Sequence, residues 1–169
     1  RGANQASASD GEGGVSVSVS TYSLDTNSIL TAWNETYRPA SFPGFWSSLE
    51  GLIRDGRSVV SSEVSRELSL KDDDAAEWAK AQPEFIIELE EEQITIVRGL
   101  ATEFPALAKE RLGRMRADGF VIALASWKGL TVVTAENRRG PAKIPNICDA
   151  RGIPCVSLAD MIEREGWTF

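Results

Sequence analysis

TYSLDTNS (residues 21–28) and LTVVTAEN (residues 130–137) are two short runs of apolar and β-branched residues, and each leads into an acidic residue. Runs of this kind are typical of buried strands, and the acids that follow them are Asp25 and Glu136. In a parallel sheet the carboxyl ends of the strands meet at one edge, where ligands bind. The two stretches therefore predict a parallel sheet with carboxylates gathered at one edge.

Further strands and helices follow outward from these two stretches. Strands are expected near residues 17–24, 57–61, 130–134 and 153–157. Helices are expected over residues 28–33, 45–54, 72–82, 88–104, 105–116, 118–127, 143–152 and 158–166, with one more beginning at Ser62. This alternation predicts an α/β fold, with a parallel sheet of about four strands and helices on both faces.

The chain has 169 residues, which is enough to bury a core and fits one domain. Residues 1–16 are rich in Gly, Ala and Ser without an apolar period, so they predict a flexible tail before a single domain over residues 17–169. No apolar run reaches the ~18 residues that span a bilayer. No basic-then-apolar signal stretch is visible either. We expect a cytoplasmic protein without membrane contact.

Histidine is absent from the sequence, and this excludes several kinds of catalytic site. Ribonucleases with a His pair, serine hydrolases with a His base and most zinc sites all need it. The two cysteines, Cys148 and Cys155, do not form a CxxC pair, and buried thiols are the favoured interpretation. Carboxylates remain as catalytic groups, and their hard oxygens suit Mg²⁺ or Mn²⁺.

The net charge of −7 is unevenly distributed along the chain. Residues 1–100 carry 8 Lys and Arg against 17 Asp and Glu, whereas residues 101–169 carry 10 against 8. Positive charge flanking an acidic metal site suits a phosphate backbone, because the metal neutralises the carboxylates while arginines hold neighbouring phosphates. Ordinary solvated surface charge is the alternative. The candidates for binding RNA phosphates are Arg114, Arg116, Arg138 and Arg139.

Two further acidic positions can join the same site. Asp118 begins the helical stretch DGFVIALA, and Glu63 and Glu67 lie four apart, hence on one face of a helix. A helix cap is the alternative role for Asp25 and for Asp118. The DDD stretch (residues 72–74) predicts a capped helix start rather than a metal site, because neighbouring side chains point different ways around a helix.

The segments YSLDTNS, SREL, DGFVIALA, LTVVTAEN and KIPNICDARGIPCVSLADMIEREGW together resemble the PIN-like nuclease domains. They resemble in particular a bacterial and archaeal branch catalogued as a domain of unknown function. The resemblance runs from about Thr21 to Phe169 and rests on the order, spacing and context of these segments. It implies a three-layer α/β/α fold and a Mg²⁺- or Mn²⁺-dependent endoribonuclease, the toxin of a toxin–antitoxin pair. RNA and a cognate antitoxin are then the expected partners, and a homodimer stays open.

The resemblance also implies roles for individual residues. Asp25 corresponds to the first metal ligand, and Glu67 matches the family's acidic residue before a Leu, which leaves Glu63 the weaker candidate. Asp118 and Glu136 complete the expected catalytic and metal-binding set. Glu136 stands where many PIN domains carry Asp, and binding through water is open for its longer side chain. The expected supporting residues are Thr26, Asn27 and Thr134.

Two other functions are weighed against a ribonuclease. One is a PIN-like module that binds RNA or protein without cutting, and the presence of Glu136 where many PIN domains carry Asp supports it. A phosphatase with Asp25 as nucleophile ranks last, because such enzymes carry a second Asp two residues later and this chain has Asn27 there. The five tryptophans lie among apolar residues and predict core packing, with Trp46 the one candidate for base stacking.

Overall fold

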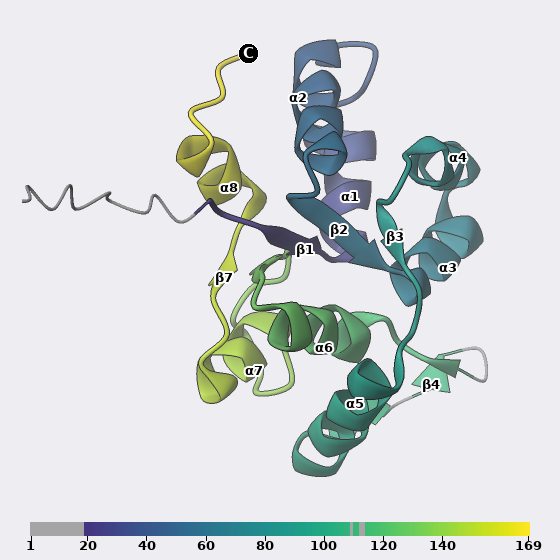
Figure 1. Cartoon of the computed structure of the whole chain (residues 1–169), viewed down its shortest axis with the longest axis vertical. Coiled ribbons are helices and arrows are strands. Elements are labelled where there is room, and N and C mark those ends of the chain that lie inside the picture. The colour runs from purple at the N-terminus through teal and green to yellow at the C-terminus, as the bar shows by residue number, and fades with distance from the viewer. Residues whose placement is uncertain (1–18, 109, 112–113) are drawn as a thin grey trace, which may run out of the picture.

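The sheet at the centre of the molecule has five strands, all parallel (Figure 1). The structure is a computed structural model that describes residues 19–108, 110–111 and 114–169. The strands, in spatial order, are β3 (Ile86–Ile87), β2 (Ser58–Ser61), β1 (Tyr22–Leu24), β6 (Thr131–Val133) and β7 (Cys155–Val156). The strand order reverses between β1 and β6, which creates the switch point where α/β proteins bind ligands.

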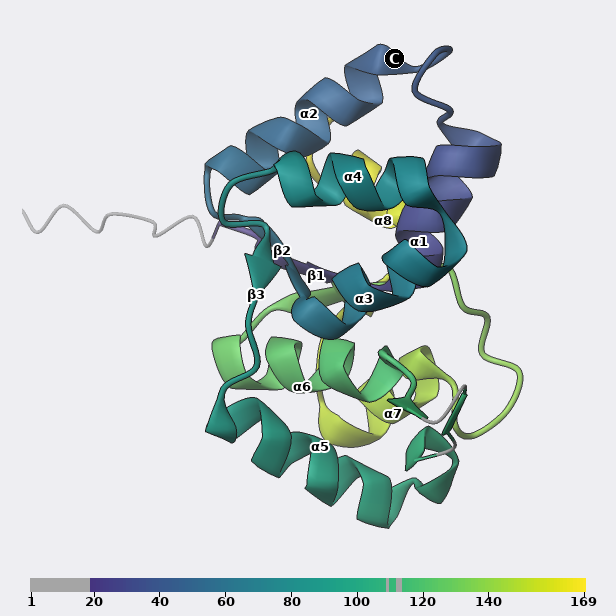
Figure 2. The ribbon, with the colours of Figure 1, turned by 90° about the vertical axis from the view of Figure 1, so that its right-hand side faces the viewer.

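Helices cover both faces of this sheet, and Figure 2 shows the three layers. On one face α6 packs against β1, β2 and β6, α7 lies beside β7, and α5 packs outside α6. On the other face lie α1, α2, α3, α4 and α8 (Figure 2). The bounds are α1 Thr26–Thr31, α2 Pro43–Arg54, α3 Ser62–Lys71, α4 Asp73–Ala81, α5 Glu91–Glu103, α6 Asp118–Lys128, α7 Ile144–Arg151 and α8 Leu158–Arg164.

Sequence patterns account for most of these helices. α6 is almost wholly buried because its run of apolar residues lies between the sheet and α5. Asp72 caps α4 and accepts a hydrogen bond from the Ala75 N–H at 3.0 Å, so the DDD stretch caps a helix as predicted. α3 begins at Ser62, and the Ser61 side chain before it is the cap, because it accepts from the Glu63 N–H.

The α/β class and the parallel sheet are confirmed, and two details of the prediction are wrong. The sheet has five strands rather than about four, because β3 is only two residues long and has no visible alternation. Residues 105–116 do not form one basic helix: Pro105–Ala108 is a 3₁₀ turn. Beyond it, β4 (Glu110–Arg111) pairs antiparallel with β5 (Arg114–Met115). The expected tail over residues 1–16 lies outside the described residues.

Aromatic side chains form much of the core around α2 and α4. Trp46 is 5% exposed, its indole N–H donates to the Tyr37 carbonyl at 2.6 Å, and its ring meets those of Trp33 and Trp78 edge to face. Trp46 is therefore a core residue, and base stacking by it is excluded. Within the described residues, no helix is long and apolar enough to cross a membrane.

Candidate metal and nucleic-acid site

Asp25 lies at the end of β1, where it caps α1. Its Oδ1 accepts hydrogen bonds from the backbone N–H groups of Asn27 and Ser28, and its Oδ2 accepts one from the Thr134 hydroxyl. The side chain is buried, and this burial raises the pKa of Asp25 to about 6, with the nearby Asp118 charge adding to the effect. Asp25 therefore caps α1, and it is also a buried carboxylate whose charged form is disfavoured by its surroundings.

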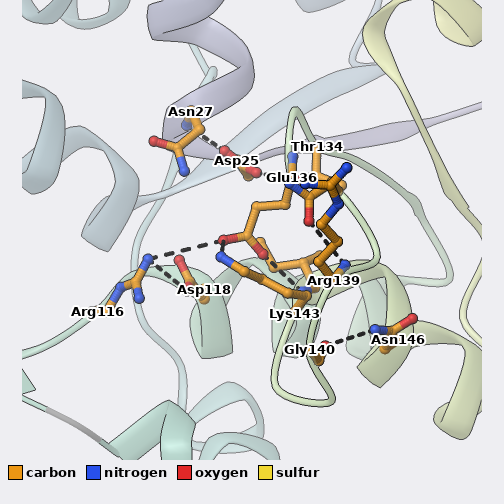
Figure 3. Close-up of polar contacts among 12 residues, drawn as sticks. Asp25, Asn27, Arg116, Asp118, Thr134, Glu136, Arg139, Gly140, Lys143 and Asn146 are labelled. Atoms are coloured by element: carbon orange, nitrogen blue, oxygen red, sulfur yellow. Dashed lines mark hydrogen bonds and ion pairs between the residues drawn. The ribbon is translucent and has the colours of Figure 1, made fainter.

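Asp118 lies beside Arg116, whose guanidinium also reaches toward Glu136 (Figure 3). Asp118 is the first residue of α6, and burial raises its pKa. The charges of Glu136 and Glu67 raise that pKa further, while Arg116 and Lys143 lower it. The Asp118 charge in turn raises the pKa of Asp25. The four predicted acids are thus coupled through their charges, and Arg116 and Thr134 contact three of them directly.

Glu67 reaches this edge from α3. One carboxylate oxygen accepts the Ala117 N–H at 2.9 Å, at the start of α6, and the other lies 3.7 Å from the Lys71 ammonium. The cap residue of α6 is Ala117 rather than Asp118, and Glu67 satisfies its N–H from another helix. Glu63 instead pairs with Arg66 at 2.7 Å on its own helix. The contacts thus favour Glu67 over Glu63 as the site residue.

Glu136 is held by groups of the loop that follows it. Its carboxylate accepts from the Ile144 N–H at 2.9 Å and from the Lys143 ammonium at 3.2 Å, and the side chain is 5% exposed. Its own N–H donates to the Thr134 hydroxyl at 3.0 Å. Thr134 thereby links Asp25 to Glu136 across the ends of β1 and β6. Glu136 also satisfies an N–H in the first turn of α7, whose cap residue offers no side chain for the purpose.

Basic side chains surround the carboxylates on the side of α6. Arg116 lies 3.3 Å from Asp118 and 4.0 Å from Glu136, so one guanidinium bridges two acids (Figure 3). A hollow of about 250 Å³ opens here, lined in part by Arg116, Arg139 and Lys143. Arg138 points elsewhere and pairs with Asp149 on α7. The Arg114 backbone lies in β5, and its side chain is outside the described part of the structure.

A second hollow, of about 400 Å³, opens on the other side of Glu136. Its lining includes the carboxamides of Asn27, Asn34 and Asn137. Asn27 was an expected supporting residue, and Thr26 beside it has a buried hydroxyl without a hydrogen-bond partner in the described structure. The hollow beyond Asn27 was not foreseen from sequence, because Asn34 reaches it from a π-helical turn with no sequence signature.

Several of these oxygens suit a hard divalent ion by their chemistry. Buried, mutually repelling carboxylates gain from a cation, and Mg²⁺ needs only one or two of them together with water. In the described structure, however, no three acidic or cysteine side chains gather around one point as a ready-made metal site. Lys143, Arg116 and two backbone N–H groups occupy positions around the acids instead. The chemistry of the donor set therefore suits a hard ion, and Asp25 and Asp118 are the acids whose raised pKa a cation would offset.

Comparison with known proteins agrees with this architecture. A family model described as "Domain of unknown function (DUF4411)" matches residues 22–169, and the chain belongs to this family. No curated protein sequence matches the chain significantly. Among solved structures, a chain of VapBC2 from Rickettsia felis, crystallised bound to a DNA fragment from their promoter, superposes with a TM-score of 0.51. It is 20% identical, over 81% of this chain and 98% of that one, and supports a PIN-like fold.

Proposed function

We propose that this protein is a metal-dependent endoribonuclease of the PIN class. The observation that carries the proposal is the set of contacts that connects the four acids at the switch point of the sheet: Thr134 links Asp25 to Glu136, Arg116 lies near both Glu136 and Asp118, and Glu67 accepts the N–H of the residue before Asp118. Carboxylates forced together in this way gain from a divalent cation, and the sequence has no histidine for another kind of catalysis. A bound Mg²⁺ or Mn²⁺ would supply activation of water and stabilisation of charge on the reacting phosphate.

The chain's own residues divide the work around that ion. Asp25 and Asp118 would hold it, since both are buried acids of raised pKa, Asp25 at the end of β1 and Asp118 at the start of α6. Thr134 fixes the Asp25 carboxylate by its hydrogen bond, and Glu67 fixes the start of α6 and hence Asp118. Glu136 positions Lys143 beside the carboxylates. Glu67 and Glu136 would support the ion from outside its direct ligands, because their carboxylates already accept from backbone N–H groups.

The basic hollow holds the substrate's phosphates. Arg116, Arg139 and Lys143 line it. The side chains of Arg116 and Lys143 are each 40% exposed and Arg139 is exposed as well, so each can reach an RNA backbone. Arginine binds phosphate oxygens bidentately, and lysine binds them as a point charge. The overall negative charge of the chain is compatible with this role because the cations are concentrated beside the site.

The partner in the cell is proposed to be an antitoxin. The fold neighbour is a VapBC2 structure, and a toxin of this class would have its acidic and basic groups covered by the partner protein. Arg139 and Arg116 would then bind RNA phosphates in the free protein and acidic groups of the antitoxin in the complex.

One observation favours a second candidate, an RNA- or protein-binding module with weak or no catalysis. Among the described residues the carboxylates are engaged by Lys143, Arg116 and backbone N–H groups rather than gathered around one point. Such a module would use the same basic hollow without cutting.

Cleavage of single-stranded RNA by the purified protein separates the two. The enzyme should cut with Mn²⁺ or Mg²⁺ and stop in EDTA, and Asp25→Asn or Asp118→Asn should lower the rate by orders of magnitude, because each removes a charge from the metal site. Cleavage that persists in EDTA would refute metal catalysis. Binding without any cleavage, in several RNAs and both metals, would favour the module.

A further inference from the structure

The acidic centre has a hollow on each side, and the two hollows differ in chemistry. Arg116 and Arg139 line the one beside α6, whereas Asn27, Asn34 and Asn137 line the other, together with Glu35. Glu136 and Lys143 border both. A phosphate is attracted to the arginines, and the Glu35 carboxylate repels it from the carboxamide side. The carboxamide hollow therefore suits an uncharged, hydrogen-bonding group.

Two of the three carboxamides are held in fixed orientations. The Asn34 Nδ2 donates to Asp72 Oδ2 at 2.9 Å, which leaves its carbonyl oxygen as an acceptor. The Asn137 Oδ1 accepts the Arg139 N–H at 2.9 Å, which leaves its amide group as a donor. Asp72 is itself fixed as the cap of α4. Orientations set in advance are what recognition of one ligand requires, because little side-chain entropy is lost on binding.

A π-helical turn delivers Asn34 and Glu35 to this hollow. Residues Ala32–Thr36 form the turn, and it closes with the Tyr37 N–H donating to the Ala32 carbonyl at 2.9 Å. Such turns are rare and are frequently found at functional sites. Leu30 adds an apolar surface to the lining, and the volume of about 400 Å³ is in the range of small-molecule sites.

We infer that this hollow is a nucleobase subsite that selects guanine next to the cleaved phosphate, an inference that rests on the proposed function. The Glu35 carboxylate has no ion-pair partner within the described chain, so it can accept two hydrogen bonds. Guanine alone among the RNA bases presents two adjacent donors, N1–H and the N2 amino group, on its pairing edge. Its O6 and N7 acceptors suit the Asn137 amide and the Lys143 ammonium.

Binding without cleavage tests the subsite directly. Fluorescence anisotropy in EDTA would compare labelled oligouridine strands that carry one central guanosine, inosine, adenosine or uridine. The guanosine strand should bind about tenfold more tightly than the uridine strand, as expected for a bidentate base contact. Inosine lacks the N2 amino group and should lose most of this preference. E35Q should likewise lose most of the guanosine preference, because an amide presents only one acceptor oxygen to the two donors of guanine.

Matched variants keep the outcome clear. N34A should reduce the preference partly, and E163Q, an exposed acid on α8, should leave it at the wild-type value. Thermal unfolding checks that each variant is folded. Binding of all strands with equal affinity, or an unchanged guanosine preference in E35Q, would overturn the subsite alone. Absence of binding to every strand would overturn the proposed function as well.

Discussion

The Thr134 hydroxyl donates a hydrogen bond to the Asp25 carboxylate, and this contact joins the ends of β1 and β6 at the switch point of the sheet. Thr134 also accepts the Glu136 N–H, so two of the candidate acids are positioned through one side chain. A buried carboxylate in this position is stabilised when a cation pairs with it or a proton neutralises it. The pH at which Asp25 takes up its proton therefore tests whether its carboxylate is buried as described.

The stability of the protein without metal should fall as the pH rises from about 4 to about 6. Burial raises the pKa of Asp25 from 3.8 to about 6, so the folded protein holds this proton more tightly than the unfolded chain. The stabilisation is complete below about pH 4 and is lost as the pH passes 6, a change of about 3 kcal/mol. Urea unfolding of the wild type and D25N in EDTA, from pH 4 to 7.5, measures it.

D25N keeps an oxygen for the α1 cap but carries no charge, so its stability should vary much less over that range. At pH 7.5 in EDTA it should therefore be the more stable protein. Identical pH profiles for the two proteins would show that Asp25 does not titrate as its burial requires.

Glu67 and Glu63 offer a matched pair on one helix. E67Q keeps an acceptor for the Ala117 N–H but loses the charge next to Asp118, so metal-dependent cleavage should fall by about 10- to 100-fold. E63Q breaks only an ion pair with Arg66 at the surface of α3 and should change the rate little. Rates under saturating Mn²⁺ compare them. Equal losses of cleavage rate in E67Q and E63Q would contradict the assignment of Glu67, rather than Glu63, to the site.

Glu136 should contribute to folding as well as to the site. In E136A the Ile144 N–H loses its acceptor and Lys143 its partner, so the free energy of unfolding should fall by roughly 1.5–3 kcal/mol. E136Q retains an acceptor and should lose distinctly less. Urea unfolding at pH 7.5 gives both values. A loss in E136Q as large as in E136A would mean that charge, rather than the N–H contact, dominates.

Arg139 and Arg138 are neighbours with different surroundings. Arg139 lines the basic hollow, whereas Arg138 is paired with Asp149. R139A should reduce the salt dependence of RNA binding by about 0.7 in the slope of log K against log salt, the value for one phosphate contact on a single strand. R138A should change the slope less. RNA-binding titrations between low and moderate salt measure both slopes. A larger change in R138A than in R139A would indicate that the RNA backbone runs along α7 instead of the basic hollow.

The sequence allowed the strand ends to be predicted because β-branched runs and the acids that follow them are local features. Thr134 links Asp25 to Glu136, and Arg116 lies near both Glu136 and Asp118, so the strand-end and helix-start positions lie near one another. The role of these acids as metal ligands stays a prediction. β3 could not be found this way, because Ile86–Ile87 is stabilised by its pairing with β2 and not by a pattern of its own.

Contacts between segments far apart in the sequence could not be predicted either, because no local pattern encodes them. The cap of α6 comes from Glu67, 50 positions away from Ala117, and the cap within α7 comes from Glu136. Asn146 holds the intervening loop by donating to the carbonyls of Arg138 and Gly140, at 2.9 and 2.7 Å. The expected helix over residues 105–116 failed because Pro105 opens a 3₁₀ turn and the following residues pair as strands.

Mn²⁺ binding, followed by electron paramagnetic resonance of the free ion, tests the central claim that carboxylates around Asp118 hold a divalent metal. The wild type should bind Mn²⁺, and D118N should bind it at least about tenfold more weakly. The substitution removes the carboxylate charge of Asp118, which interacts with the charges of the other three acids. E63Q should match the wild type. Equal Mn²⁺ affinity in the wild type and D118N would contradict a metal site at this edge of the sheet.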